Sequence, residues 1–104
     1  MDIQVSDFQP LAAGTRLGTL TVYFAGIGLS IRRLDLHVFK EGAEVRWWVA
    51  GPTAPYVNAA GHSKKYAYLC WRTRAESDDF QHVALTQLAA LLPELGIDPA
   101  RRAF

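Results

Sequence analysis

The chain has 104 residues, of which 50% are hydrophobic and 20% charged, and eleven Lys and Arg against ten Asp and Glu leave a formal net charge of +1. This length supports one domain that can bury a core without disulfides or metal, and the balance of residues excludes a disordered chain. The single cysteine, Cys70, excludes an intramolecular disulfide. The start has no signal-peptide pattern and no apolar run is long enough for a bilayer, so we expect a cytoplasmic protein without a membrane span.

The first predicted elements are an arm and a strand. Residues 1–14 are polar, contain a proline and have no clear period, so we expect a loosely attached N-terminal arm. Residues 17–26 alternate between apolar and polar side chains, which predicts a strand. Gly26 and Gly28 tolerate the positive φ of a tight turn, so this strand should lead into a hairpin.

The second strand of this hairpin is predicted to contain a β-bulge. Residues 29–39 alternate again, but Leu29 and Ile31 are out of phase with the later apolar residues of the run. One extra residue near Arg32 and Arg33 restores the phase, and a bulge inserts such a residue.

Two more strands are expected before a helix. Residues 45–50 alternate, and the phase of the valines places Trp47 on the inward face and Trp48 on the outward face. Residues 51–63 hold two prolines, two glycines and an asparagine without a period, which is typical of a long functional loop. Residues 65–72 alternate and predict a fourth strand.

One amphipathic helix is predicted after Arg74. Ser77 is a suitable N-cap, and two acidic residues follow it, where the helix dipole favours negative charge. The apolar stripe expected to face the sheet is Phe80, Ala84, Leu88, Leu91 and Leu95. A glycine and a proline beyond the stripe should end the helix, so residues 96–104 are expected to be a C-terminal tail.

These elements predict an α+β fold, a four-stranded antiparallel sheet followed by one C-terminal amphipathic helix packed on one face, in a single domain over residues 15–95. The side of the sheet expected to face the helix carries Leu20, Val22, Phe24, Leu34, Leu36, Val38, Val45, Trp47, Val49, Ala67, Leu69 and Trp71. The opposite side would present Tyr23, Arg33, His37, Phe39, Arg46, Trp48, Tyr66, Tyr68 and Arg72. An aromatic and basic face should meet a partner, either nucleic acid or a second copy in a homodimer.

The segment between Thr15 and Arg74 gives the clearest indication of function. It holds nine of the twelve aromatic residues and carries nine Lys and Arg against three Asp and Glu, a local charge of +6. Cations beside flat stacking surfaces suit single-stranded DNA or RNA. The expected contacts are Tyr23, Arg33, Arg46, Trp48, Lys64, Lys65, Tyr66, Tyr68, Arg72 and Arg74. We therefore predict a non-enzymatic protein that binds single strands with little sequence preference, without a metal or a small-molecule cofactor.

Short motifs in this segment resemble a known family. The run from Trp47 to Thr53, a polar loop with Asn58 and Gly61, and then Lys64-Lys65-Tyr66 are similar to the heart of the SpoVG septation-regulator family. The similarity covers residues 17–92 and implies a small dimeric bacterial protein that binds DNA or RNA. The sequence departs from the family pattern at Gly51, at Thr53 and throughout the predicted strand that contains Cys70 and Trp71. The order of strands and helix is also similar to half of the Whirly-type single-stranded DNA binders, which dimerise and bind on their sheets.

Three alternatives stay open. The aromatic residues can instead fill the core and a self-association interface, which would make the protein a homo-oligomeric interaction or scaffold domain. The basic residues can form an ordinary solvated surface. Asp35 and His37 stand two apart on one strand face and could form an acid/base pair or part of a metal site, although Arg33 beside them disfavours a cation and we expect a surface hydrogen bond. A small enzyme or ligand-binding protein would need a pocket under residues 51–63.

Overall fold

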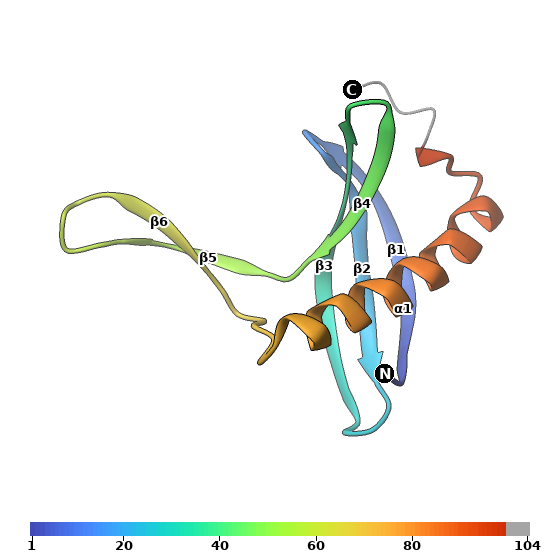
Figure 1. Ribbon diagram of the computed structural model, residues 1–104, viewed down its shortest axis with the longest axis horizontal. Helices are drawn as coiled ribbons and strands as arrows, with labels where there is room; N and C mark the ends of the chain where they lie inside the picture. The colour runs from blue at the N-terminus through green and yellow to red at the C-terminus, as the bar shows by residue number, and fades with distance from the viewer. Residues whose placement is uncertain (100–104) are drawn as a thin grey trace.

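The computed structural model describes residues 1–99, apart from the side chain of Ala12, and has an α+β fold. Four strands form an antiparallel sheet in chain order: β1 (Ile3–Ala13), β2 (Arg16–Phe24), β3 (Leu29–Glu41) and β4 (Glu44–Ala50). A separate two-stranded sheet of β5 (Thr53–Val57) and β6 (Ser63–Ala67) follows, and then the helix α1 (Arg74–Glu94). Figure 1 shows α1 lying across one face of the four-stranded sheet. A four-stranded antiparallel sheet and a C-terminal helix are therefore present as predicted, but the fourth strand of that sheet is β1 and not the strand predicted over residues 65–72.

The core lies between α1 and the sheet. Its fully buried members on the sheet are Leu20, Val22, Leu34, Leu36 and Val38, and on the helix Phe80, Ala84, Leu88 and Leu92. Phe24, Val45, Trp47, Leu69 and Trp71 are partly buried against this core, whereas Ala67 is exposed. The helix-facing side predicted from the alternation is thus confirmed for β2, β3 and β4. Leu69 and Trp71 also pack on the core but lie outside any strand, and Ala67 belongs to the separate sheet.

The first fourteen residues are not a loosely attached arm. Ile3 and Phe8 are buried, and β1 pairs with β2 along its length. A Cβ on Gly18 would lie 2.5 Å from the carbonyl oxygen of Gln9 and 2.5 Å from Cζ of Phe8, so the close packing of β1 on β2 requires glycine there. The prediction failed because irregularities in β1 interrupt the two-residue period that marks a strand.

The predicted bulge in β3 is confirmed. Leu20 pairs with Leu34 and Val22 pairs with Ile31. Between these two pairs β3 advances by three residues and β2 by two. Because Ile31 and Leu34 both face the core, Arg32 and Arg33 between them both face outward. A bulge therefore presents two adjacent side chains on the same face.

The helix begins earlier than predicted. Its N-cap is Thr73, whose Oγ1 accepts a hydrogen bond from the backbone N–H of Glu76 at 3.2 Å, so the expectation of Ser77 as N-cap is wrong. Thr73 and Glu76 have the Thr-x-x-Glu spacing of a capping box, which predicts a helix start as well as Ser77 does. Toward the other end, Leu92 is buried in place of Leu95, which is exposed at the C-cap, and Leu91 packs partly against the core.

Two glutamines tie α1 to the opposite edges of the sheet. Gln81 Nε2 donates to the carbonyl oxygen of Val49 at 2.7 Å, and the Val49 N–H donates to Gln81 Oε1 at 2.9 Å. Gln87 makes the same pair of bonds to β1, to the Ile3 carbonyl oxygen and from the Val5 N–H, both at 2.7 Å. These bonds pair backbone groups at β4 and β1, the two edge strands, which would otherwise present unpaired polar groups.

The predicted fourth strand over residues 65–72 does not join the main sheet. Residues 63–67 form β6, which pairs with β5 in a region expected to be a loop. Of the predicted tail, Ile97 packs on the core and Pro99 is buried, and residues 100–104 lie outside the described residues. In the part of the chain that the structure describes, no helix is long and apolar enough to cross a membrane.

Candidate nucleic-acid interface

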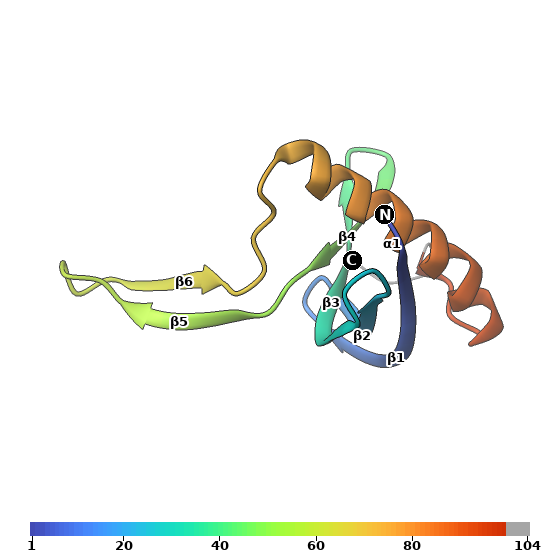
Figure 2. The same ribbon diagram turned by 90° about the horizontal axis from the view of Figure 1, so that it is seen from below.

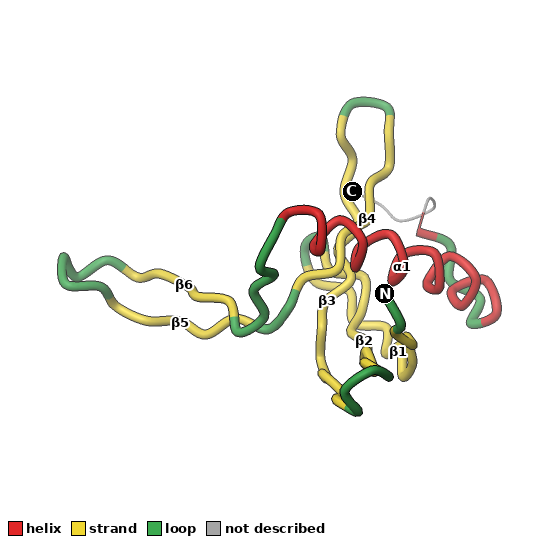
Figure 3. Tube along the Cα trace, turned by 60° about the horizontal axis from the view of Figure 1, so that its bottom comes forward, coloured by secondary structure: helices red, strands yellow, loops and turns green. Residues whose placement is uncertain are grey.

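The hairpin of β5 and β6 projects away from the rest of the molecule, as Figures 2 and 3 show from two directions. Its ladder runs from Thr53 opposite Ala67 to Val57 opposite Ser63. Asn58 closes the tip, because its side-chain oxygen accepts hydrogen bonds from the N–H groups of Ala60 at 3.0 Å and His62 at 2.9 Å. The hairpin therefore presents its side chains on both faces to solvent.

Three tyrosines form a contiguous aromatic surface on this hairpin. Tyr56, Tyr66 and Tyr68 are 44%, 47% and 63% exposed. The ring centroids of Tyr56 and Tyr66 are 5.8 Å apart, and those of Tyr66 and Tyr68 are 5.2 Å apart. A hydrogen bond with Tyr66, and then the charge of that neighbour, raise the pKa of Tyr68, so Tyr68 is uncharged at neutral pH. The three rings thus offer flat, exposed aromatic surface.

The charge of the hairpin is entirely positive. Lys64 lies directly opposite Tyr56 and two residues before Tyr66, which places it on the tyrosine face; Lys65 points to the other face. Neither lysine forms an ion pair with any described residue. From Gly51 to Thr73 the sequence contains no Asp or Glu, so no carboxylate of the hairpin offsets these charges.

The main sheet carries four of the predicted contacts on the face turned away from α1. Tyr23, Arg33, Arg46 and Trp48 alternate with core residues of β2, β3 and β4. Trp48 is 43% exposed, whereas Trp47 packs on the core, which confirms the predicted orientation of the pair. Arg46 Nε lies 2.8 Å from the carboxylate of Glu41, and an adjacent nitrogen lies 3.4 Å from that of Glu44, so its charge is already offset.

Arg72 and Arg74 lie at the start of α1 and are also paired. The Nε of Arg72 lies 3.1 Å from Glu76, and that of Arg74 lies 3.1 Å from Asp78. The ten predicted contacts are therefore split among the hairpin, the outer face of the main sheet and the helix start. The hairpin holds Lys64, Lys65, Tyr66 and, just beyond β6, Tyr68.

Asp35 and His37 do not pair with each other. Asp35 lies 3.5 Å from a guanidinium nitrogen of Arg16, and His37 Nδ1 shares a 2.8 Å hydrogen bond with the hydroxyl of Thr15. Each side chain therefore has a different partner: Asp35 forms an ion pair and His37 a hydrogen bond.

No family model matches this chain, and neither the curated proteins nor the solved structures contain a match. The similarities to the SpoVG family and to the Whirly-type proteins stay predictions. Function must accordingly be inferred from the chemistry of the surface.

Tyr56 is the one member of the tyrosine surface that was not predicted. It lies inside the stretch interpreted as a loop, next to prolines that obscure the period. The signal that could have found it is the Asn58 to Gly61 turn, which stands between two short runs of strand-forming residues.

Proposed function

We propose that this protein binds single-stranded DNA or RNA with little sequence preference and that the β5–β6 hairpin is its main binding element. One observation carries the proposal: three neighbouring exposed tyrosines lie beside lysines that form no ion pair with residues 1–99, on a projecting hairpin that lacks acidic residues. Unstacked bases can stack on the rings while phosphates meet the ammonium groups. The rings contact any base through its flat face, which favours little sequence preference.

The root of the hairpin supports an extension of this interface onto the main sheet. Trp48 borders a hollow of about 210 Å³ whose lining also includes Thr53 and Ala67, the first and last residues of the hairpin ladder. A strand that lies along the Lys65 face of the hairpin, which Thr53 and Ala67 share, could therefore continue past Trp48. In this account Arg46, Arg72 and Arg74 contribute less than the lysines, because carboxylates already neutralise them.

The first prediction concerns salt. The affinity for oligo-dT should fall linearly on a log–log plot of binding constant against salt, with a slope of roughly −0.7 for each phosphate contact. Replacing Lys64 and Lys65 together by glutamine should reduce the magnitude of that slope by about 1.4, because two contacts are lost. Tryptophan and tyrosine fluorescence titrations at several salt concentrations measure the slope.

Arg46→Gln is the control for this titration, because it removes one positive charge that two glutamates already offset. Its slope should change less than that of the lysine variant. An affinity that does not vary with salt, or no binding even at low salt, would rule out the nucleic-acid proposal.

Self-association through the same hairpin is the second candidate function. The observation in its favour is that Val57 is 68% exposed on the face opposite the tyrosines, on a two-stranded sheet that has little packing of its own. Isolated two-stranded hairpins are marginally stable in water, and a second copy could cover these residues in a homodimer.

A further inference from the structure

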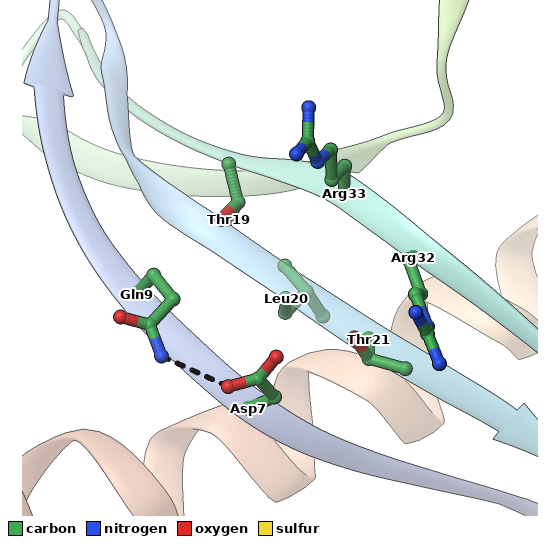
Figure 4. A pocket seen from close by; sticks show the side chains of 7 residues that line it. All are labelled: Asp7, Gln9, Thr19, Leu20, Thr21, Arg32 and Arg33. Carbon is green, nitrogen blue, oxygen red and sulfur yellow. Dashed lines mark hydrogen bonds between the residues drawn. The ribbon is translucent and has the colours of Figure 1, made fainter.

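A polar hollow lies on the outer face of the main sheet between two bulges. Its volume is about 330 Å³, and Figure 4 shows its lining side chains. Arg32 and Arg33 come from β3 on one side, Asp7 and Gln9 come from β1 on the other, and threonines of β2 lie between them. This volume is at the lower end of the range of small-ligand sites.

The two bulges are built alike. In β1, Ser6 pairs with Thr21 and Gln9 pairs with Thr19. Between these two pairs β1 also advances by three residues and β2 by two. Val5 and Phe8 face the core, which leaves Ser6 and Asp7 both on the outer face, as the bulge in β3 does with its two arginines. The two bulges flank the same stretch of β2 and turn polar side chains toward one hollow.

Both bulges hold a residue in an unfavourable backbone conformation. Asp7 has a φ of 52° and Arg33 a φ of 61°, and they are the two non-glycine residues with positive φ in the described part of the chain. Glycine would adopt this conformation without strain, so the side chains of Asp7 and Arg33 make the backbone of the folded state locally less favourable. Backbone strain of this kind gathers at ligand sites.

The arginines of the hollow differ from the other arginines that the structure describes. Arg16, Arg46, Arg72 and Arg74 each lie within 3.5 Å of a carboxylate oxygen. Arg32 and Arg33 form no ion pair with any residue of the described range 1–99. Two guanidinium groups that have no ion-pair partner among the described residues therefore line the same hollow.

We infer that this double-bulge hollow binds a phosphate group. Guanidinium forks match phosphate oxygens geometrically, and the hydroxyls of Thr19 and Thr21 supply further donors. Asp7 accepts a 2.8 Å hydrogen bond from Gln9 Nε2, so one of its oxygens is already engaged. Two arginines and one aspartate give the lining a net charge of +1, which one singly charged phosphodiester neutralises.

The phosphate can belong to a nucleic-acid backbone or to a free phosphate ester, and the position of the hollow bears on the first source. A neighbouring hollow of about 520 Å³ shares Gln9, Thr19 and Arg33 with it and reaches Pro52 and Thr53 at the root of the β5–β6 hairpin. A strand bound as proposed above could pass from the hairpin to the arginines. The inference itself does not require that function, because a free ester would meet the same groups.

The test is a pair of titrations of the full chain at constant salt, one with adenosine monophosphate and one with oligo-dT. Both are monitored by NMR of the backbone amides. We expect saturable shifts of the Asp7, Thr19 and Arg33 amides with at least one of these probes. Arg33→Gly and Arg32→Gln should each weaken that binding about tenfold, the scale of one charge-assisted hydrogen bond. Arg33→Gly should melt at the same temperature as the parent chain or higher, because glycine relieves the positive φ.

The controls separate this site from the hairpin. Arg46→Gln removes an arginine from the same face and should weaken binding less than Arg32→Gln or Arg33→Gly does, since its charge is already offset. Binding of the monophosphate that survives Tyr66→Ala identifies a free-ester site even if the hairpin binds no nucleic acid. Shifts seen with oligo-dT alone, and lost in Arg33→Gly, identify a backbone phosphate. If neither probe shifts these amides saturably, or if binding is equal in Arg33→Gly and the parent chain, the inference is wrong.

Discussion

Phe80→Ala is expected to lower the free energy of unfolding by about 3 to 5 kcal/mol, the range for truncating a buried phenylalanine. Phe80 is 1% exposed and lies at the centre of an aromatic group on the core, with ring centroids 4.9 Å from Trp71 and 6.3 Å from Phe24. A cavity at this point would also loosen the segment that joins the β5–β6 hairpin to α1. Domains of this size are stable by only about 5 to 15 kcal/mol, so most of the stability could be lost.

Urea unfolding followed by tryptophan fluorescence measures this loss. Phe80→Leu, which keeps more of the volume, should lose less and stays measurable if the alanine variant does not fold. Leu95→Ala is the control, because Leu95 lies exposed at the end of the same helix and should change stability by less than about 0.5 kcal/mol. A Phe80→Ala chain as stable as the Leu95 variant would show that the helix does not pack as described.

Gln81→Leu is expected to cost about 2 to 6 kcal/mol even though it keeps the size of the side chain. The substitution leaves both the N–H and the carbonyl oxygen of Val49 without their hydrogen bonds, and each unsatisfied buried group costs about 1 to 3 kcal/mol. Gln81 is 7% exposed, so water cannot readily replace the lost partners.

Gln87→Leu provides the matched comparison at the opposite edge of the sheet. It removes the same two kinds of bond, to Ile3 and Val5, but at a partly buried site where water can substitute. Its loss in urea unfolding should therefore be smaller, about 1 kcal/mol. Equal losses for the two variants would contradict the difference in burial, and no loss for Gln81→Leu would contradict the clamp on β4.

The bulges show how far the sequence predicts this fold. The change of phase between Ile31 and Leu34 predicted the bulge in β3 correctly, because long alternating runs on both sides define the phase. The same change of phase between Val5 and Phe8 lies in a short run with a proline. No period is visible there, so the pattern predicts an arm and not a strand. A local period identifies a strand only where enough residues flank the irregularity.

The pairing of the strands could not be predicted from the sequence. Alternation over residues 65–72 indicates a strand but contains no information about which sheet it joins, so the projecting hairpin was not foreseen. The positive charge and aromatic content of that region were visible from composition alone. Whether carboxylates neutralise Arg72 and Arg74 depends on where the helix begins. With Thr73 as N-cap, Arg72 pairs with Glu76 and Arg74 with Asp78, each four residues further along the chain.

The central claim, that the tyrosines of the β5–β6 hairpin stack on bases, is tested most directly by oligo-dT titration of Tyr66→Ala and Tyr68→Ala against the matched Tyr→Phe variants. Each alanine variant should bind about 1 to 3 kcal/mol more weakly, whereas phenylalanine keeps the ring and should bind nearly as well as the parent chain. Light scattering on the same samples gives the mass of each variant. If the alanine variants bind oligo-dT as tightly as the parent per folded molecule while their mass falls from dimer to monomer, the tyrosines form a self-association interface and the nucleic-acid account is wrong.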